Sequence, residues 1–155
     1  MASFRDSAGR EWVVTINPWL MKQVRDRTGV HLGKLLDDQF AGYAALMGDV
    51  VQLVDVLFVL CAEQAAREGV TDEQFGRALA GDAVEAAAAA FEEAFADFCP
   101  SHLRRILRAM RAKGVEAQAT ATPRVMEVIS KLDLGATFSP SATTSGASSA
   151  STPPG

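Results

Sequence analysis

The sequence predicts a mainly α-helical fold: a small bundle of five or six helices with an N-terminal β-hairpin and a disordered C-terminal tail. Alanine, the best helix former, supplies much of the 48 % apolar share, and only 7 % of residues are aromatic. Between Asp49 and Pro100 the apolar residues recur every three or four positions, as on one face of a helix. The 155 residues are enough for one domain with its own core, which we place at residues 1–138.

Residues 3–17 have the pattern of a β-hairpin. Trp12, Val14 and Ile16 alternate with the residues between them, which is typical of a half-buried strand. The tetrapeptide at 6–9 has turn composition and ends in a glycine that tolerates a positive φ. Because a lone hairpin is marginal in water, we expect this one to cover an end of the core. The alternative is that its edge pairs with a strand of a partner.

Two helical regions follow the hairpin. Asn17 is expected to cap the first helix and Pro18 to occupy its first position, where a missing N–H costs no hydrogen bond. Gly29 is expected to end this helix. Residues 30–47 keep helical spacing but contain glycines, which predicts one or two short helices joined loosely.

The stretch 49–100 is predicted to hold three helices, each begun by a capping residue three positions before an acid or amide. The first helix is apolar on most of its circumference, and its unbroken apolar run, residues 56–62, is predicted to be the buried centre of the bundle. The third helix carries a stripe of alanine and phenylalanine. The predicted caps are Asp49, Thr71 and Asp82, and the predicted ends are Gly69, Gly81 and Pro100.

A basic helix is predicted at 102–113, and it holds one third of the 15 Lys and Arg residues. Its arginines are expected to face the acidic side of the preceding helix or an acidic partner. The acidic residues concerned are Glu85, Glu92 and Asp97. A last short helix is expected at 123–132, and the uncharged residues 139–155 are predicted to form a flexible tail.

Composition and motifs limit the functions that can be expected of this chain. A net charge of -4 and a pI of about 5.1 argue against wholesale nucleic-acid binding. Cys61 and Cys99 lie in apolar helical patterns and are expected to be buried, reduced thiols. Without a signal sequence or an apolar run of about 20 residues, the chain is expected to be soluble and to stay inside the cell. No motif for a metal, cofactor, nucleotide or nucleophile is found, so we expect no enzymatic activity and no cofactor.

Two stretches resemble a known family. The first is FRDSAGREWVVTI at 4–16, followed by KQVRD at 22–26. The second is LVDVLFVLC at 53–61, followed by GVTDEQFG at 69–76, ALAGD at 78–82 and DFCP at 97–100. Together they are similar to the small tail assembly chaperones encoded in the tail modules of long-tailed bacteriophages and prophages. The resemblance covers about residues 4–113, and its motifs are caps, turns and apolar stripes.

The resemblance implies a non-catalytic helper of virion morphogenesis in the cytoplasm of the bacterial host. Chaperones of this family hold the long, aggregation-prone tape measure protein, recruit tail tube subunits and are absent from the finished virion. A longer form is often made by ribosomal frameshifting near the C-terminus. No membrane partner is expected, because no apolar run is long enough to span a bilayer, and self-association stays open.

Two alternatives stay open. A nucleic-acid-binding regulatory or packaging protein would use the basic helix 102–113, through Arg104, Arg105, Arg108 and Arg111. A structural tail or head–tail component would instead be found in purified virions. No family motif defines the binding residues, so the expectation is physical. The partner-binding residues expected are Leu53, Leu57, Phe91, Phe95, Arg104, Arg105 and Arg108.

Overall fold

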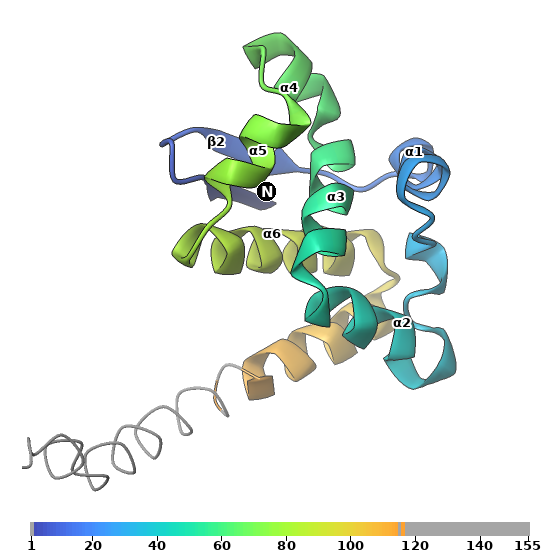
Figure 1. Cartoon of the computed structure of the whole chain (residues 1–155). Helices are drawn as coiled ribbons and strands as arrows, with labels where there is room; N and C mark the ends of the chain where they lie inside the picture. The colour runs from blue at the N-terminus through green and yellow to red at the C-terminus, as the bar shows by residue number, and fades with distance from the viewer. Residues whose placement is uncertain (1, 115, 117–155) are drawn as a thin grey trace, which may run out of the picture. The chain divides into compact units, whose positions relative to one another are not determined.

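A computed structural model describes residues 2–114 and 116 (Figure 1). It divides the chain into two units, Met1–Arg111 and Ala112–Gly155. The first unit is mainly helical with a short N-terminal antiparallel hairpin, which confirms the predicted fold class. In the second unit only residues 112–114 and 116 are described, and all four are helical. The predicted domain end at 138, the helix at 123–132 and the tail at 139–155 lie outside the described residues.

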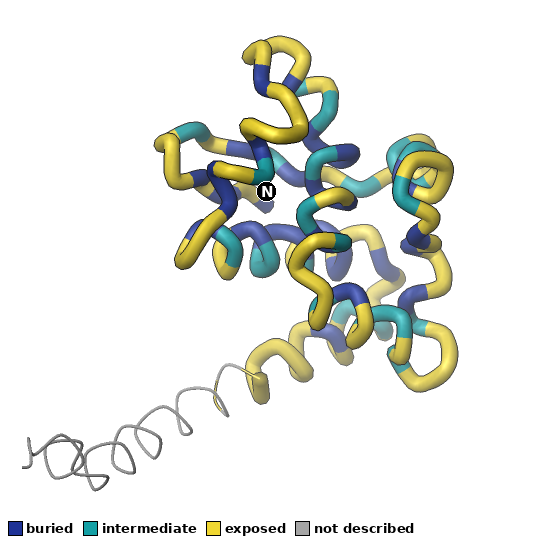
Figure 2. Tube along the Cα trace, in the orientation of Figure 1, coloured by how far each residue is buried: buried dark blue, intermediate teal, exposed yellow. Residues whose placement is uncertain are grey.

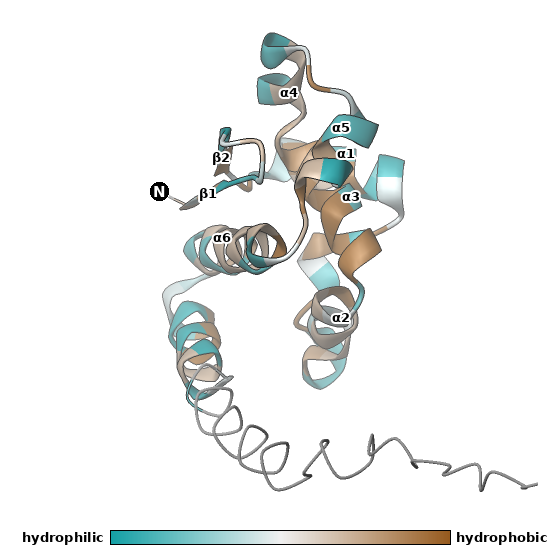
Figure 3. Ribbon diagram, turned by 60° about the vertical axis from the view of Figure 1, so that its left-hand side comes forward, coloured by the Kyte–Doolittle hydropathy of each residue, from teal (hydrophilic) through white to brown (hydrophobic). Residues whose placement is uncertain are grey.

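The elements of the first unit surround one central helix, α3. This helix contacts α1, α2, α4, α5 and α6, while α6 also packs against both strands of the hairpin. Figure 3 shows α3 as a strongly hydrophobic helix. A further helical segment covers residues 101–111. The elements are β1 (Ala2–Arg5), β2 (Glu11–Val14), α1 (Pro18–Thr28), the 3-10 helix η1 (Leu32–Lys34), α2 (Asp37–Gly48), α3 (Val50–Leu60), α4 (Ala62–Glu68), α5 (Asp72–Ala78) and α6 (Asp82–Phe98).

Most of the predicted helix ends are confirmed by their hydrogen bonds. The Asn17 side chain accepts from the Leu20 N–H at the start of α1, and Pro18 is the first helical residue. Thr71 and Gln74 form a reciprocal capping box at the start of α5. The Asp49 side chain caps α3. The left-handed glycines predicted to end helices are Gly29, with φ 77°, and Gly69, with φ 67°.

Three predictions for the central stretch were wrong. The first helix does not run unbroken to Gly69, because Cys61 leaves helical geometry, with φ −98° and ψ 7°, and separates α3 from α4. Asp82 does not cap the third helix, since it is already the first residue of α6 and its side chain makes no cap hydrogen bond. Gly81 does not end the second helix. It precedes α6 with φ 57° and ψ −129°, a conformation that suits glycine.

An aromatic cluster joins the hairpin to the helices. The Phe75 ring of α5 meets the Trp12 ring edge-on, with centroids 4.9 Å apart, and it also contacts Phe4 and Phe58. Trp12 is fully buried. Figure 2 shows buried residues along the side of α6 that faces the hairpin. The hairpin therefore belongs to the core of this unit, as expected for a structure too small to be stable alone.

The hairpin turn is built around the buried carboxylate of Asp6. Its Oδ1 accepts hydrogen bonds from the backbone N–H groups of Ala8 and Arg10, both at 3.0 Å. Its Oδ2 accepts from Arg10 Nε at 2.8 Å and from the indole N–H of Trp12 at 2.9 Å. Burial alone raises the pKa of Asp6, but the hydrogen bonds from Trp12 and Arg10 and the Arg10 charge outweigh it. The pKa of Asp6 therefore lies below its ordinary value.

The outer edge of β2 is closed by a side chain instead of a third strand. Gln64 of α4 accepts from the Val13 N–H at 3.2 Å and donates to the Glu11 carbonyl at 2.6 Å. These two backbone groups point away from β1, so the amide of Gln64 replaces the peptide of a neighbouring strand. The bend at Cys61, which lies between α3 and α4, precedes this contact by three residues.

Asp6→Asn is expected to lower the free energy of unfolding by about 2–4 kcal/mol at pH 7, because an amide offers donors where Trp12 and Arg10 also donate. The folded pKa of Asp6 is depressed, so its stabilising contribution is fully present above the ordinary value of 3.8. It is lost as the pH falls through the folded pKa. Urea unfolding of the wild type and the variant, at pH 7 and in steps below pH 3.8, measures both effects.

The matched control is Asp55→Asn, since Asp55 is an exposed acid on α3. It should change the free energy of unfolding by less than about 0.5 kcal/mol. A difference between wild type and Asp6→Asn that stays constant over the whole acid range would contradict the role given to this carboxylate.

Candidate partner-binding surface

The four apolar residues predicted to bind a partner are core residues in this structure. Leu53 and Leu57 of α3 are buried, as are Phe91 and Phe95 of α6. The Phe91 and Phe95 rings stack with centroids 5.9 Å apart. These side chains fill the space inside the unit and do not line an exposed groove in this structure, so their role in partner binding stays a prediction. An apolar surface that is exposed in this structure has to lie elsewhere.

The arginines of the basic helix are partly occupied by α6. Arg104 donates to the carbonyls of Ala96 and Asp97, at 3.1 and 2.8 Å, and so satisfies the C-terminal end of α6. Arg108 pairs with the Asp97 carboxylate at 3.1 Å. Arg105 is exposed and has no ion pair within residues 2–114 and 116. Of the three arginines predicted to bind a partner, two therefore have partners inside this unit.

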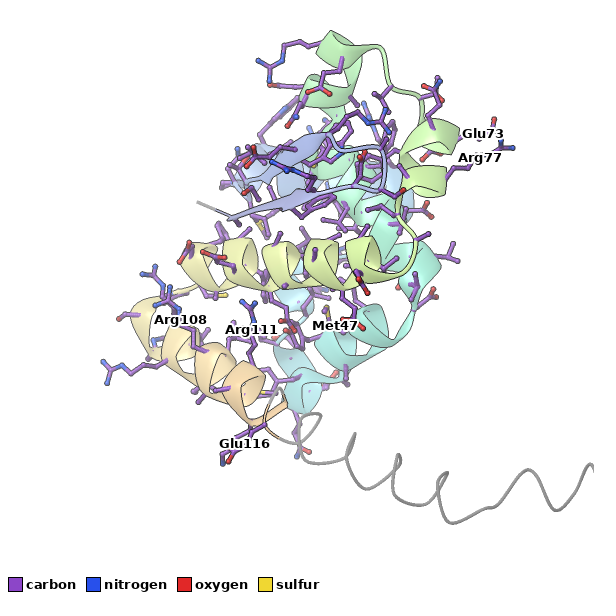
Figure 4. All side chains as sticks on the ribbon, turned by 90° about the vertical axis from the view of Figure 1, so that its left-hand side faces the viewer. Met47, Glu73, Arg77, Arg108, Arg111 and Glu116 are labelled. Atoms are coloured by element: carbon purple, nitrogen blue, oxygen red, sulfur yellow. The ribbon has the colours of Figure 1, made fainter. Side chains whose placement is uncertain are left out.

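The expectation that these arginines face the acidic side of α6 is confirmed at two of its three acids. Arg108 reaches Asp97, and Arg111 reaches Glu92 at 3.4 Å. Figure 4 shows the Arg108 and Arg111 side chains between residues 101–111 and α6. Glu85 lies in the first turn of α6, while the basic helix lies against the other end. Because Glu85 lies at the opposite end of α6, it does not pair with these arginines.

The same acidic side anchors α2. The Tyr43 hydroxyl donates to Glu92 Oε1 at 2.8 Å, and its ring stacks on Phe95 with centroids 6.1 Å apart. Burial raises the pKa of Tyr43, and the Glu92 carboxylate raises it further, so the hydroxyl keeps its proton. A network from Tyr43 through Glu92 to Arg111 thus ties three helices together.

The beginning of α2 is a tight left-handed turn. Asp38, Gln39 and Phe40 have φ values of 50°, 58° and 65°. This conformation costs roughly 1–2 kcal/mol for each non-glycine residue. The turn brings the Tyr43 N–H to the Leu35 carbonyl at 2.9 Å. The close approach favours a glycine, because a Cβ at Gly42 would lie 3.3 Å from Leu35 Cα, which is a tight contact.

Beyond this turn, α2 and the first turn of α3 expose a nearly uncharged surface. The two helices meet at an angle of 89° (Figure 1). No charged residue occurs from Gln39 to Gly48. On α3, Val50 is 49 % exposed and Val51 is 73 % exposed. Large exposed apolar side chains gathered in one place are typical of interaction sites. We define the apolar corner as the exposed residues Ala41, Ala44, Ala45, Gly48, Val50 and Val51.

Sequence reasoning missed the apolar corner, although the sequence contained a signal for it. Val50 keeps helical spacing with Leu53 and Leu57, so periodicity alone does not separate it from these core residues. A helix that is apolar on most of its circumference must expose part of it when neighbours cover only one side. Val51 is on the uncovered side.

The described residues carry little further chemistry. Among residues 2–114 and 116, no group of three His, Cys, Asp or Glu residues is placed to hold a metal ion. Both thiols are buried and unpaired, as predicted, and burial raises the pKa of Cys61 to about 12. No single helix in this part of the chain is long and apolar enough to cross a membrane. Taken together, α2 and α3 pass that test by length and composition, but they are sharply bent.

Comparison of the chain with protein-family models, with curated proteins and with solved structures gives no match. A functional proposal for this protein therefore depends on its surface chemistry and on the resemblance in its sequence.

Tyr43→Phe should reduce the free energy of unfolding by about 1 kcal/mol, because it removes one hydrogen bond and keeps the ring that packs on Phe95. Since Tyr43 anchors α2, hydrogen exchange should quicken at the amides of 43–48. Exchange in β2 serves as the internal reference and should not change. Unchanged exchange in α2 would show that this helix does not depend on the Tyr43 anchor.

Proposed function

We propose that this protein is a non-catalytic assembly chaperone that binds phage tail proteins, the tape measure protein first, through the apolar corner. The observation that carries the proposal is the exposure of Val50 and Val51 beside the uncharged residues 39–48 of α2. The resemblance to tail assembly chaperones supplies the class of partner. The proposal moves the binding surface from the buried residues of α3 to its exposed N-terminal turn.

The corner has the chemistry that an amphipathic helix of a partner needs. Its alanines and glycine are small, so the backbone of a partner helix can approach α2 closely. Its valines are stiff side chains that lose little rotamer freedom when they are covered. Burial of apolar surface stabilises a complex by about 25 cal/mol per Å² removed from water. A long partner with several such helices would be kept soluble by covering them one at a time.

Charge contributes little to this mode of binding. Asp49 is the one charged residue between Gln39 and Val51, and its side chain already caps α3. We therefore expect the affinity of the corner for its partner to change little with salt concentration. Binding to nucleic acid through the basic helix would instead weaken steeply as salt is added.

Co-expression of the full chain with the tape measure protein is expected to keep that protein soluble. Ala45→Lys together with Val51→Lys should abolish the effect, because two charges would be buried under the partner helix. Both residues are exposed, so the melting temperature should stay within a few degrees of the wild type. The soluble fraction of the tape measure protein is the measurement.

The matched control is Ala66→Lys together with Ala86→Lys, two exposed sites on α4 and α6 that add the same charge. It should protect the tape measure protein as well as the wild type does. If the tape measure protein precipitates equally with and without this chain, the proposal fails. Recovery of the chain from purified virions would favour a structural component of the tail instead.

A further inference from the structure

A pocket of about 380 Å³ opens between α1 and η1. Gly29 adopts a left-handed conformation at the end of α1 and reverses the chain, so that η1 returns beside the helix. Leu32 is buried and, with the half-buried Met21, supplies an apolar floor. Gly33 has no side chain, which lets the Met21 methyl group lie close to the backbone of η1. The volume is in the range of ligand pockets.

Every ionisable side chain that lines this pocket is basic: Lys22, Arg25, His31 and Lys34. Arg25 pairs with the neighbouring Asp26 at 3.3 Å. The other three have no ion pair within residues 2–114 and 116. Residues 17–34 contain four Lys and Arg against one Asp, a net charge of +3, while the whole chain carries -4. The pocket is thus a local positive site on an acidic protein, and it complements an anion.

The apolar part of the pocket determines which kind of anion it can bind. An inorganic phosphate would use the cations and leave the half-buried Met21 uncovered. A nucleic acid would also use the cations, but the net charge of -4 on the whole chain opposes the approach of a long polyanion, and His31 is the one aromatic ring among the described lining residues. A peptide with carboxylates beside an aliphatic side chain uses both parts of the pocket. The thioether of Met21 is adaptable enough to pack against such a side chain.

We propose that the pocket between α1 and η1 binds an acidic, leucine-containing segment of the partner protein. Lys22 and Lys34 hold carboxylates of the segment, and an aliphatic side chain lies on Met21. The identity of the partner rests on the proposed function, whereas the peptide chemistry of the pocket does not. η1 ends three residues before α2 begins, so the pocket and the apolar corner lie on consecutive elements.

The test measures binding of a labelled peptide with alternating Glu and Leu residues to the full chain by fluorescence anisotropy. Saturable binding is expected, together with at least a fivefold weakening when salt is raised from low to physiological concentration. Trp19 provides a second readout, because it is 61 % exposed and lies 5.8 Å from the Lys22 ammonium. Trp12, the other tryptophan, is fully buried and contributes a constant background.

Lys22→Glu together with Lys34→Glu should weaken peptide binding at least tenfold while the melting temperature stays close to that of the wild type, since both side chains are exposed. The matched control is Arg67→Glu together with Arg105→Glu, which changes the net charge equally at exposed sites outside the pocket. It should change the affinity less than twofold. A peptide with Gln in place of every Glu should not bind.

Three results would overturn the inference. The first is equal peptide binding by the pocket variant and the control variant. The second is tighter binding of a single-stranded oligonucleotide than of the peptide, lost in the same pocket variant. The third is displacement of the peptide by inorganic phosphate at equal concentration. The peptide assay contains no tail protein. A negative result in this assay would therefore not contradict the proposed function, and a negative co-expression result would not contradict peptide binding by the pocket.

Discussion

The hydrogen bonds of one buried carboxylate determine how the hairpin joins the helices. Asp6 accepts from two backbone groups of the turn, from the Arg10 guanidinium and from the Trp12 indole. This arrangement directs the Trp12 ring at Phe75 of α5. The next residue, Ser7, donates both its N–H and its hydroxyl to the Ala78 carbonyl. The hairpin packs against α6, and α6 contacts α3, so this turn is linked through α6 to the central helix.

The parts of the fold that depend on local chemistry could be predicted, and those that depend on distant contacts could not. The Asn17 cap and the Thr71 capping box each involve residues three positions apart, so their patterns are visible in the sequence. The break at Cys61 accompanies a contact between Gln64 and β2 across 51 residues. The contacts of Ser7 and Trp12 with α5 likewise join residues more than 60 positions apart. Neither set of contacts leaves a pattern in the local sequence.

The same difference between local patterns and distant contacts explains why the residues expected to bind a partner are buried. Strong helical periodicity, as at Leu53 and Leu57, marks residues that face the core, and it therefore selects the residues least available to a partner. Charge complementarity predicted contacts better than helical periodicity did, because Arg108 and Arg111 form ion pairs with the acids of α6. The pocket is assembled from two elements around a chain reversal, and its cations are spread over residues 22–34. Their common position becomes apparent only in three dimensions.

The side-chain amide of Gln64 also has a consequence for strand register. It bonds only those backbone groups of β2 that point away from β1, at Glu11 and Val13. A slip of β2 by one residue would turn these groups inward and move Trp12 to the solvent face. A slip by two residues would restore the alternation but would separate Asp6 from its donors. The turn and the edge thus exclude different misalignments, which leaves a hairpin of four-residue strands with a single permitted pairing.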